Sequence, residues 1–187
     1  MSTVLEITPL EIPDVKLVRT KRFGDARGFF SEVYSRPAFV AHGIHIDFVQ
    51  DNHSLSLTTG TVRGLHFQTP PFAQDKLVRV TRGRILDVAV DIRKASSTFG
   101  RHVAVELSAE NWCQLLVPLG FAHGFCTLAS NTEVVYKVSA PYNPQHDAGI
   151  LWSDPDLAIS WPIDSGRAVI SERDKSLPRF RDIVSPF

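Results

Sequence analysis

The sequence predicts an all-β protein, a sandwich or barrel formed by one domain with a few short helices. Short segments of alternating apolar and polar residues recur along the chain, as is typical of half-buried strands. Turn residues such as Pro, Gly, Ser and Asn separate these segments at close spacing, and helical periodicity is sparse. Many short strands at such spacing favour two packed sheets or a closed barrel.

The clearest strands lie in the middle of the chain. Residues 76–80 and 85–92 both alternate, and residues 81–84 between them indicate a turn, so we expect a hairpin of two paired strands. Tyr136 shares a strand face with apolar neighbours, so its hydroxyl is expected to need a partner inside the fold. Further strands are expected at residues 27–33, 48–57, 102–107, 112–117, 124–128 and 132–138.

Helices are expected at only two places. Residues 36–42 fit a short helix with Pro37 in its first turn, and residues 164–178 fit another turn or two. Pro and Gly are scattered and not clustered, so no linker stands out. We therefore expect one domain over residues 1–187.

Composition limits the classes of function. The chain has 187 residues, of which 43% are hydrophobic and 21% charged, enough for a substantial core. Its 20 basic and 20 acidic residues give zero net charge, which disfavours nucleic acid and anionic membranes as partners. The apolar stretches are too short for a membrane span, and the N-terminus lacks a secretory pattern. Cys113 and Cys126 are expected to be free, packed thiols in a reducing cytoplasm.

Two segments bring together side chains that carry chemistry. Residues 60–68 include His66 and Gln68, which share one side of a strand, and residues 118–125 place His123 after a turn. This arrangement resembles the paired motifs of cupin jelly rolls, many of which bind a metal through His-x-His, a Glu and a later His. Here Gln68 stands at the second His, and no carboxylate follows before Asp75. Two histidines are a poor site for a divalent ion, so we expect no catalytic metal.

An ordered set of motifs makes the resemblance more specific. They lie at residues 23–30, 50–54, 61–68, 76–80, 87–93, 97–100, 118–125, 136–137, 149–155 and 159–162. Together they resemble the dTDP-4-dehydrorhamnose 3,5-epimerase family of cupins nearly from end to end. The resemblance implies a cupin jelly roll and a 4-keto-6-deoxy hexose substrate carried on dTDP. Epimerisation beside the ketone at carbon 4 needs acid–base groups but no redox cofactor.

The resemblance also implies roles for four catalytic residues. His66 matches the family's base, and Asp174 is expected to hydrogen-bond its other ring nitrogen and support the charged imidazolium. Tyr136 matches the acid that returns a proton from the opposite face. Lys76 matches a cation near the carbon-4 oxygen, where it would stabilise the enolate.

The remaining matches are substrate-binding positions. In the family, the segment that carries Phe23, Arg27 and Glu32 reaches into the site of a partner subunit, so a homodimer is implied. The full set implied to contact substrate is Phe23, Arg27, Glu32, Gln50, Asp51, Asn52, Arg63, His123, Asp147 and Arg173.

The sequence departs from the family pattern at three places, and two of these departures, at Asp147 and Pro141, keep alternatives open. Asp147 stands where Glu is usual, Arg173 where Lys is usual, and Pro141-Tyr142 where two tyrosines are frequent. One alternative is an enzyme of antibiotic-sugar assembly that inverts only carbon 3 or carbon 5, although Tyr136 favours inversion at both. Another is a cupin that only binds a sugar nucleotide, which the combined catalytic set disfavours. A metal-dependent cupin oxygenase is the most distant alternative.

Overall fold

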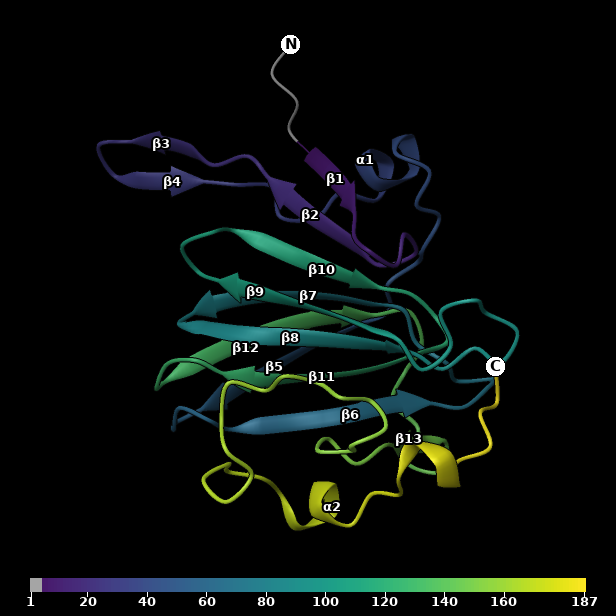
Figure 1. The fold of residues 1–187 in the computed structure, drawn as a ribbon. Helices are drawn as coiled ribbons and strands as arrows, with labels where there is room; N and C mark the ends of the chain where they lie inside the picture. The colour runs from purple at the N-terminus through teal and green to yellow at the C-terminus, as the bar shows by residue number, and fades with distance from the viewer. Residues whose placement is uncertain (1–4) are drawn as a thin grey trace.

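Two antiparallel sheets face each other in the computed structural model, which describes residues 5–187 (Figure 1). The first sheet has the strand order β1 (Leu5–Pro9), β2 (Lys16–Thr20), β10 (Cys113–Val117), β7 (Lys76–Arg82), β12 (Thr132–Val138) and β5 (Gln50–Ser56). The second has the order β13 (Asp147–Gly149), β6 (Val62–Gln68), β11 (Phe121–Thr127), β8 (Arg84–Asp91) and β9 (His102–Ser108). The all-β sandwich expected from the sequence is confirmed. The first four residues of the expected domain lie outside the described part.

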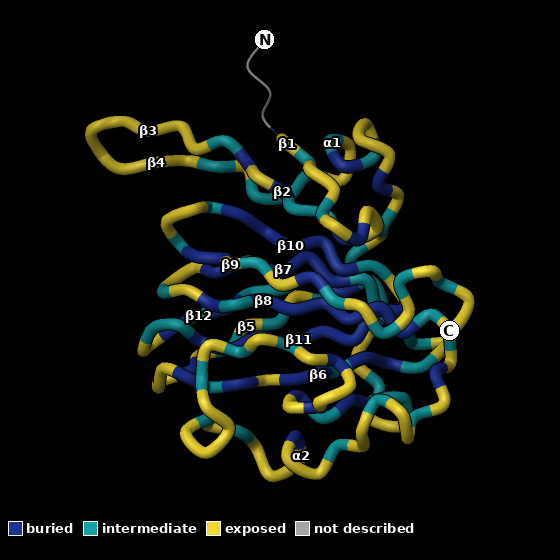
Figure 2. Tube along the Cα trace, in the orientation of Figure 1, coloured by how far each residue is buried: buried dark blue, intermediate teal, exposed yellow. Residues whose placement is uncertain are grey.

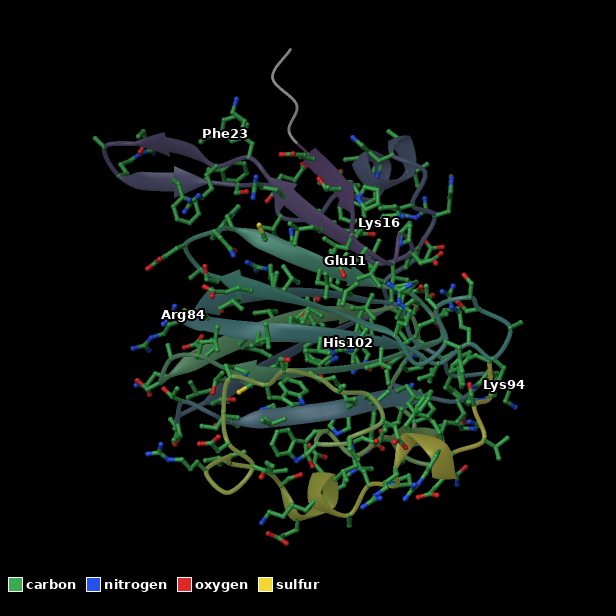
Figure 3. The ribbon with its side chains drawn as sticks, in the orientation of Figure 1. Glu11, Lys16, Phe23, Arg84, Lys94 and His102 are labelled. Atoms are coloured by element: carbon green, nitrogen blue, oxygen red, sulfur yellow. The ribbon has the colours of Figure 1, made fainter. Side chains whose placement is uncertain are left out.

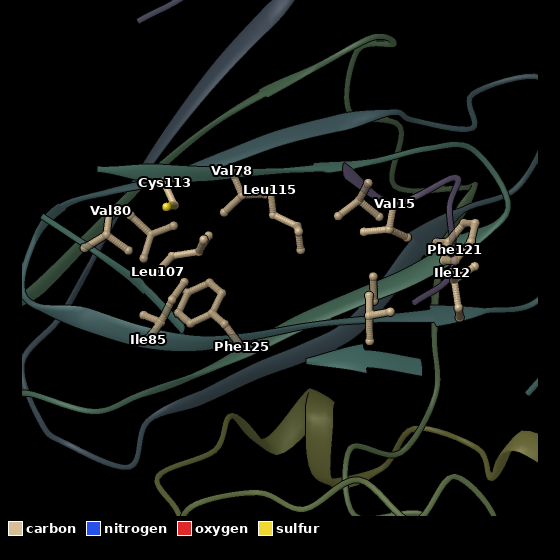
Figure 4. Close-up of a cluster of buried hydrophobic side chains, with 14 residues drawn as sticks. Ile12, Val15, Val78, Val80, Ile85, Leu107, Cys113, Leu115, Phe121 and Phe125 are labelled. Atoms are coloured by element: carbon tan, nitrogen blue, oxygen red, sulfur yellow. The ribbon is translucent and has the colours of Figure 1, made fainter. Parts of the chain in front are cut away.

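Alternation along the strands builds the core between the sheets. Val78, Val80 and Val134 point inward from the first sheet and meet Ile85 and Phe125 of the second (Figure 4). These side chains are almost completely withdrawn from water. Burial of such apolar surface is the main favourable contribution to folding. Cys113 and Cys126 are both free and buried, as expected.

The expected hairpin of residues 76–80 and 85–92 is wrong, although both strands exist. β7 is hydrogen-bonded to β10 and β12, whereas β8 lies in the opposite sheet between β11 and β9. Gly83 between them has a φ of 76°, and a Cβ there would lie 2.4 Å from Oγ1 of Thr132. The turn therefore carries the chain from one layer to the other. Alternation shows that a strand has a buried face, but not which strand it pairs with.

The expected strand at residues 27–33 is confirmed only over Gly28–Phe30. The segment forms a short hairpin of β3 (Phe23–Asp25) and β4 (Gly28–Phe30), which projects from the sandwich and is exposed along its length (Figure 2). The other expected strands are confirmed with small shifts at their ends. The first expected helix appears as α1 (Arg36–Ala41), with Pro37 in its first turn, whereas residues 164–178 supply only the single turn α2 (Glu172–Lys175).

The C-terminal segment covers the outer face of the second sheet and carries α2 to β6 (Figure 1). Leu157 and Phe180 from this segment pack against Leu65, Val88 and Val90 of the sheet. This packing holds a segment distant in sequence beside the strand that carries His66. None of the helices in residues 5–187 has the length and apolar character needed to cross a membrane.

Candidate active site

A cleft opens between the two sheets beside β6 and β12. Its larger part is a cavity of about 510 Å³, and a second cavity of about 210 Å³ adjoins it. Both cavities are lined by His66, Lys76, Tyr136 and Arg173, so we treat them as one cleft. The sequence-predicted residues that line it are His66, Lys76, Tyr136, Asp174, Gln50, Asn52, Arg63, His123, Asp147 and Arg173.

Two glycines bring the strands of the two cleft histidines close together. A Cβ on Gly64 would lie only 2.5 Å from the Cα of Gly124 on the neighbouring strand, and the φ of Gly64 is 126°. A side chain at this position would therefore force β6 and β11 apart. In the observed register His66 and His123 are direct partners across these strands. The pairing register of β6 and β11 shifts just beyond His123, and this irregularity changes the direction of the side chains that follow.

His66 is held by a carboxylate from the far end of the chain. Its Nε2 lies 2.8 Å from Oδ1 of Asp174, and the other carboxylate oxygen accepts the backbone N–H of Gly64 at 3.2 Å. Burial opposes the charge on Asp174, but these hydrogen bonds outweigh it and hold the pKa of this carboxyl below its usual value. An ionised carboxylate at Nε2 assigns the ring proton to that nitrogen. Nδ1 of His66 is then the atom left to accept a proton from a ligand.

Lys76 and Tyr136 come from neighbouring strands of the first sheet. Lys76 points inward beside Val78 and is only 8% exposed. Burial lowers the pKa of Lys76 to about 8, opposed by the charges of Asp147 and Asp87. Burial also raises the pKa of Tyr136 above its usual value, so its phenol remains protonated at neutral pH. These two groups are therefore a cation and a proton donor within one cleft.

The expectation of an internal partner for Tyr136 is not met. The ring packs against the core as expected, but its hydroxyl makes no hydrogen bond to any residue from 5 to 187. The side chain lines both cavities. Its hydroxyl is thus available to a bound molecule.

His123 forms a second histidine–carboxylate pair that sequence reasoning missed. Its Nε2 lies 2.7 Å from Oδ1 of Asp87, which is completely buried. Asp87 shares the inner face of β8 with Ile85 and Ala89, and it was overlooked because alternating strands were expected to carry polar residues on a solvated side. A carboxylate between apolar residues of a central strand is the signal that could have identified it.

A polar network lies at the mouth of the cleft, where the departures from the family pattern meet. Nη2 of Arg173 lies 2.6 Å from Oδ2 of Asp147, which also accepts the Tyr142 hydroxyl at 3.1 Å. Nη1 of Arg173 is 3.5 Å from Nε2 of His66. The carbonyl of Pro141 accepts the side-chain amide of Gln68 at 3.2 Å. The three departures are therefore neighbours in space and adjust one edge of the cleft together.

Four expected substrate-binding residues do not line the cleft of their own chain. Asp51 lies on the opposite face of β5 from Gln50 and Asn52 and pairs with Lys137 at 2.8 Å, so it does not line this cleft and its expected substrate contact stays a prediction. Strand alternation is the reason, because adjacent residues point to opposite faces. The other three belong to or follow the exposed hairpin, on which Figure 3 labels Phe23; they are Phe23, Arg27 and Glu32.

A metal site in a protein needs three or four ligands that lie close together. Across residues 5–187, no group of three or more His, Cys, Asp or Glu side chains is arranged to hold a metal ion. The cleft histidines are each paired with a carboxylate, as expected for groups that exchange or orient protons.

The fold and the cleft define a cupin-type jelly roll whose interior carries acid–base groups. The profile of the dTDP-4-dehydrorhamnose 3,5-epimerase family matches residues 9–182. The chain belongs to this family, which confirms the resemblance seen in its motifs.

Individual relatives agree with this assignment. The chain is 52% identical to a dTDP-4-dehydrorhamnose 3,5-epimerase from Sinorhizobium fredii, over 95% of this chain and 91% of the relative. It is similar to the Bacillus anthracis enzyme solved with TDP and PPi bound, with a TM-score of 0.90 and 48% identity over 94% of this chain and 99% of that one. It is also similar to the Legionella pneumophila enzyme in complex with dTDP-4-keto-L-rhamnose, with a TM-score of 0.92 and 40% identity over 96% and 95% of the two chains.

Proposed function

We propose that this chain is an isomerase that inverts carbons 3 and 5 of dTDP-4-dehydro-6-deoxy-D-glucose and so produces dTDP-4-dehydro-L-rhamnose. The observation that carries the proposal is the arrangement of His66, Lys76 and Tyr136, which come from three strands and line one cleft. Carbons 3 and 5 both flank the ketone at carbon 4, so the protons on both are acidified. A base, a proton donor and a cation are what inversion at such carbons requires.

The base step uses the ring nitrogen that Asp174 leaves free. Nδ1 of His66 takes the proton from the carbon, and the electron pair of the C–H bond moves into an enolate whose charge lies on the carbon-4 oxygen. Asp174 stabilises the imidazolium that forms, through its 2.8 Å contact to Nε2. The ammonium of Lys76 stabilises the enolate oxygen in a site of low dielectric.

The acid step uses the phenol of Tyr136. Its proton is delivered to the carbon from the face opposite His66, which inverts the centre. Tyr136 then regains a proton from solvent, and His66 releases the one that it took. The same cycle at the second carbon completes the reaction, which is redox-neutral and requires no metal or organic cofactor.

The other cleft residues bind the substrate. Arg63 and Arg173 supply fixed positive charge for the pyrophosphate, and Arg63 is held by Ser56 and the carbonyl of Leu55. The polar residues that contact the sugar or the nucleotide are Gln50, Asn52, His123 and Asp147.

The projecting hairpin supports a homodimer. Phe23, Phe29 and Phe30 on this hairpin are all exposed, and within residues 5–187 Arg27 pairs only with Asp25 of the same turn. An exposed group of aromatic residues indicates a surface that another molecule covers. In our proposal the hairpin and Glu32 of one subunit complete the cleft of the other, and the single domain of residues 1–187 functions in the cytoplasm with reduced thiols.

The direct test is proton NMR of the purified protein with dTDP-4-dehydro-6-deoxy-D-glucose in D₂O, coupled to a reductase that accepts the L-sugar product. Deuterium at carbons 3 and 5 with formation of the reduced L-sugar supports the proposal. Exchange at one carbon with the matching single epimer would instead assign the chain to single inversion. Absence of exchange from a folded protein that binds dTDP would indicate a binding protein.

A further inference from the structure

Two buried carboxylates on β8 differ in how their oxygens are paired. Asp91 accepts hydrogen bonds from Arg93, Ser96 and Thr98, which satisfy both of its oxygens. Asp87 is equally buried, but only its Oδ1 has a partner, and Oδ2 has none among residues 5–187. An ionised oxygen without a partner is costly inside a protein. The hydrogen bonds of Asp91 are those expected of a residue that stabilises the fold. The unpaired oxygen of Asp87 is not explained by stability.

The surroundings of Asp87 connect it to the cleft. Its Oδ1 binds Nε2 of His123, which leaves Nδ1 of that ring without a hydrogen bond in the described chain. His123 lines the cleft, so Nδ1 is the ring atom that can meet a ligand. The charge of Asp87 also attracts the ammonium of Lys76. Asp87 thus acts on two cleft side chains without reaching the cleft itself.

We propose that Asp87 is a positioning residue for the epimerase reaction, which holds the His123 ring with Nδ1 toward the sugar and supplies the negative charge that faces the Lys76 ammonium. The inference rests on the proposed function, because the enolate oxygen is what Lys76 stabilises. The unpaired oxygen persists because its charge keeps a buried cation next to the reacting atoms. Groups that lower the stability of a protein are often kept at a catalytic site because they are needed for activity.

The pH dependence follows from the charges around Lys76. The pKa of Lys76, about 8, is already lowered by burial, and Asp87 and Asp147 each oppose that effect. Removal of the Asp87 charge lowers the pKa of Lys76 further, so the cation is lost at a lower pH. The other titratable or charged groups that line the cleft with Lys76 are His66, His123, Tyr136, Tyr142, Arg63, Arg173 and Asp174.

The test compares Asp87→Asn with the matched control Asp91→Asn on the same strand. For Asp87→Asn we expect kcat to fall by about 10- to 100-fold with KM changed by less than about 3-fold, because the residue orients groups used in the transition state. The alkaline limb of its kcat profile should shift to lower pH, and its melting temperature should stay the same or rise. For Asp91→Asn we expect a lower melting temperature with an unchanged pH profile. Wild-type kcat and an unmoved alkaline limb in Asp87→Asn would overturn the proposal.

A measurement on the unaltered protein covers the case in which Asp87→Asn fails to fold. Two-dimensional ¹H–¹⁵N NMR of the histidine rings should show a proton on Nε2 of His123 in the dTDP complex. A ring with a bare Nε2 would overturn the proposal. If wild-type protein exchanges no deuterium from the substrate, the proposed function fails, and this ring measurement still decides whether Asp87 positions His123.

Discussion

The two histidine–carboxylate pairs of the cleft use the same chemical groups in different settings. His66 and Asp174 come from β6 and α2, 108 residues apart, and the His66 side chain is 27% exposed. His123 and Asp87 come from adjacent strands of one sheet, and the His123 side chain is 8% exposed. An accessible ring can exchange protons with substrate and solvent, whereas a nearly sealed ring is suited to hold an orientation and a charge. Both rings line the cleft, so it is exposure to solvent, rather than the pairing itself, that separates the proposed base from its proposed support.

Replacement of each histidine in turn should give the largest difference between the two pairs and tests which ring acts as the base. His66→Ala should abolish deuterium exchange at both carbons, a loss of about 10²–10⁴-fold or more, because no other base remains in position. His123→Ala should leave measurable exchange at both carbons. Proton NMR in D₂O measures both variants, with circular dichroism as the control for folding. Near-full turnover by His66→Ala would show that the base is misassigned.

Tyr136→Phe separates the acid step from the base step. The change removes one hydroxyl and keeps the ring that packs against the core. We expect coupled product formation to fall by about 10²-fold, and the first proton abstraction, followed as loss of label from carbon, to fall less. An equal loss in both measurements would contradict the role of Tyr136 as proton donor.

Lys76→Met tests whether a buried cation is retained at the expense of stability. The folded pKa of Lys76 is about 8, below its ordinary value of 10.5, so the unfolded chain binds more protons between these values and stability rises with pH across that window. At pH 7 the variant should be more stable by up to about 3 kcal/mol, because the desolvation cost of the charge is removed. It should also have a much lower kcat. Urea unfolding at pH 7 and pH 10 measures the effect, and a variant that is destabilised at pH 7 would contradict it.

Asp174→Asn should reveal, through acid stability, the charge of the carboxylate that holds His66. The folded pKa of Asp174 lies below its ordinary value, so its contribution to stability is present above about pH 4 and is lost as pH falls through the folded pKa. We expect the variant to be less stable than wild type at pH 7 by about 1 kcal/mol, with the difference shrinking as the pH falls through the folded pKa. Urea unfolding across this range measures it. A difference that does not depend on pH would mean that the carboxylate charge plays no part.

The smallest effect is expected at the mouth of the cleft. Arg173→Lys keeps the charge but loses the planar donor geometry that contacts Asp147. We expect KM to rise by about 2- to 5-fold with little change in kcat. Steady-state kinetics with the full sugar nucleotide measures this, and Arg167→Lys, on an exposed turn outside the cleft, is the matched control. A large fall in kcat would instead place Arg173 next to the reacting carbons.

The local pattern of the sequence predicted much of this molecule. Alternation correctly indicated most strands and placed Tyr136 on a face with buried neighbours. The family resemblance pointed to His66, Lys76 and Asp174, all of which line the cleft. The same alternation overlooked Asp87, because a polar residue in a strand is usually on the solvated face. Asp51 lies away from this cleft for a related reason, since its motif neighbours Gln50 and Asn52 point to the other side of β5.

The sequence alone was enough to predict the fold class and the family and to name candidate acid–base residues, because these depend on residue type, short-range periodicity and the order of motifs. Only the tertiary structure decided that β7 and β8 lie in opposite sheets, that α2 closes on His66, and that the sealed pair of His123 and Asp87 lies beside the accessible one. Strand pairing and burial are properties of contacts between residues far apart in the chain. A local pattern records that a face is buried, whereas the packing of the whole molecule decides which side chains meet there.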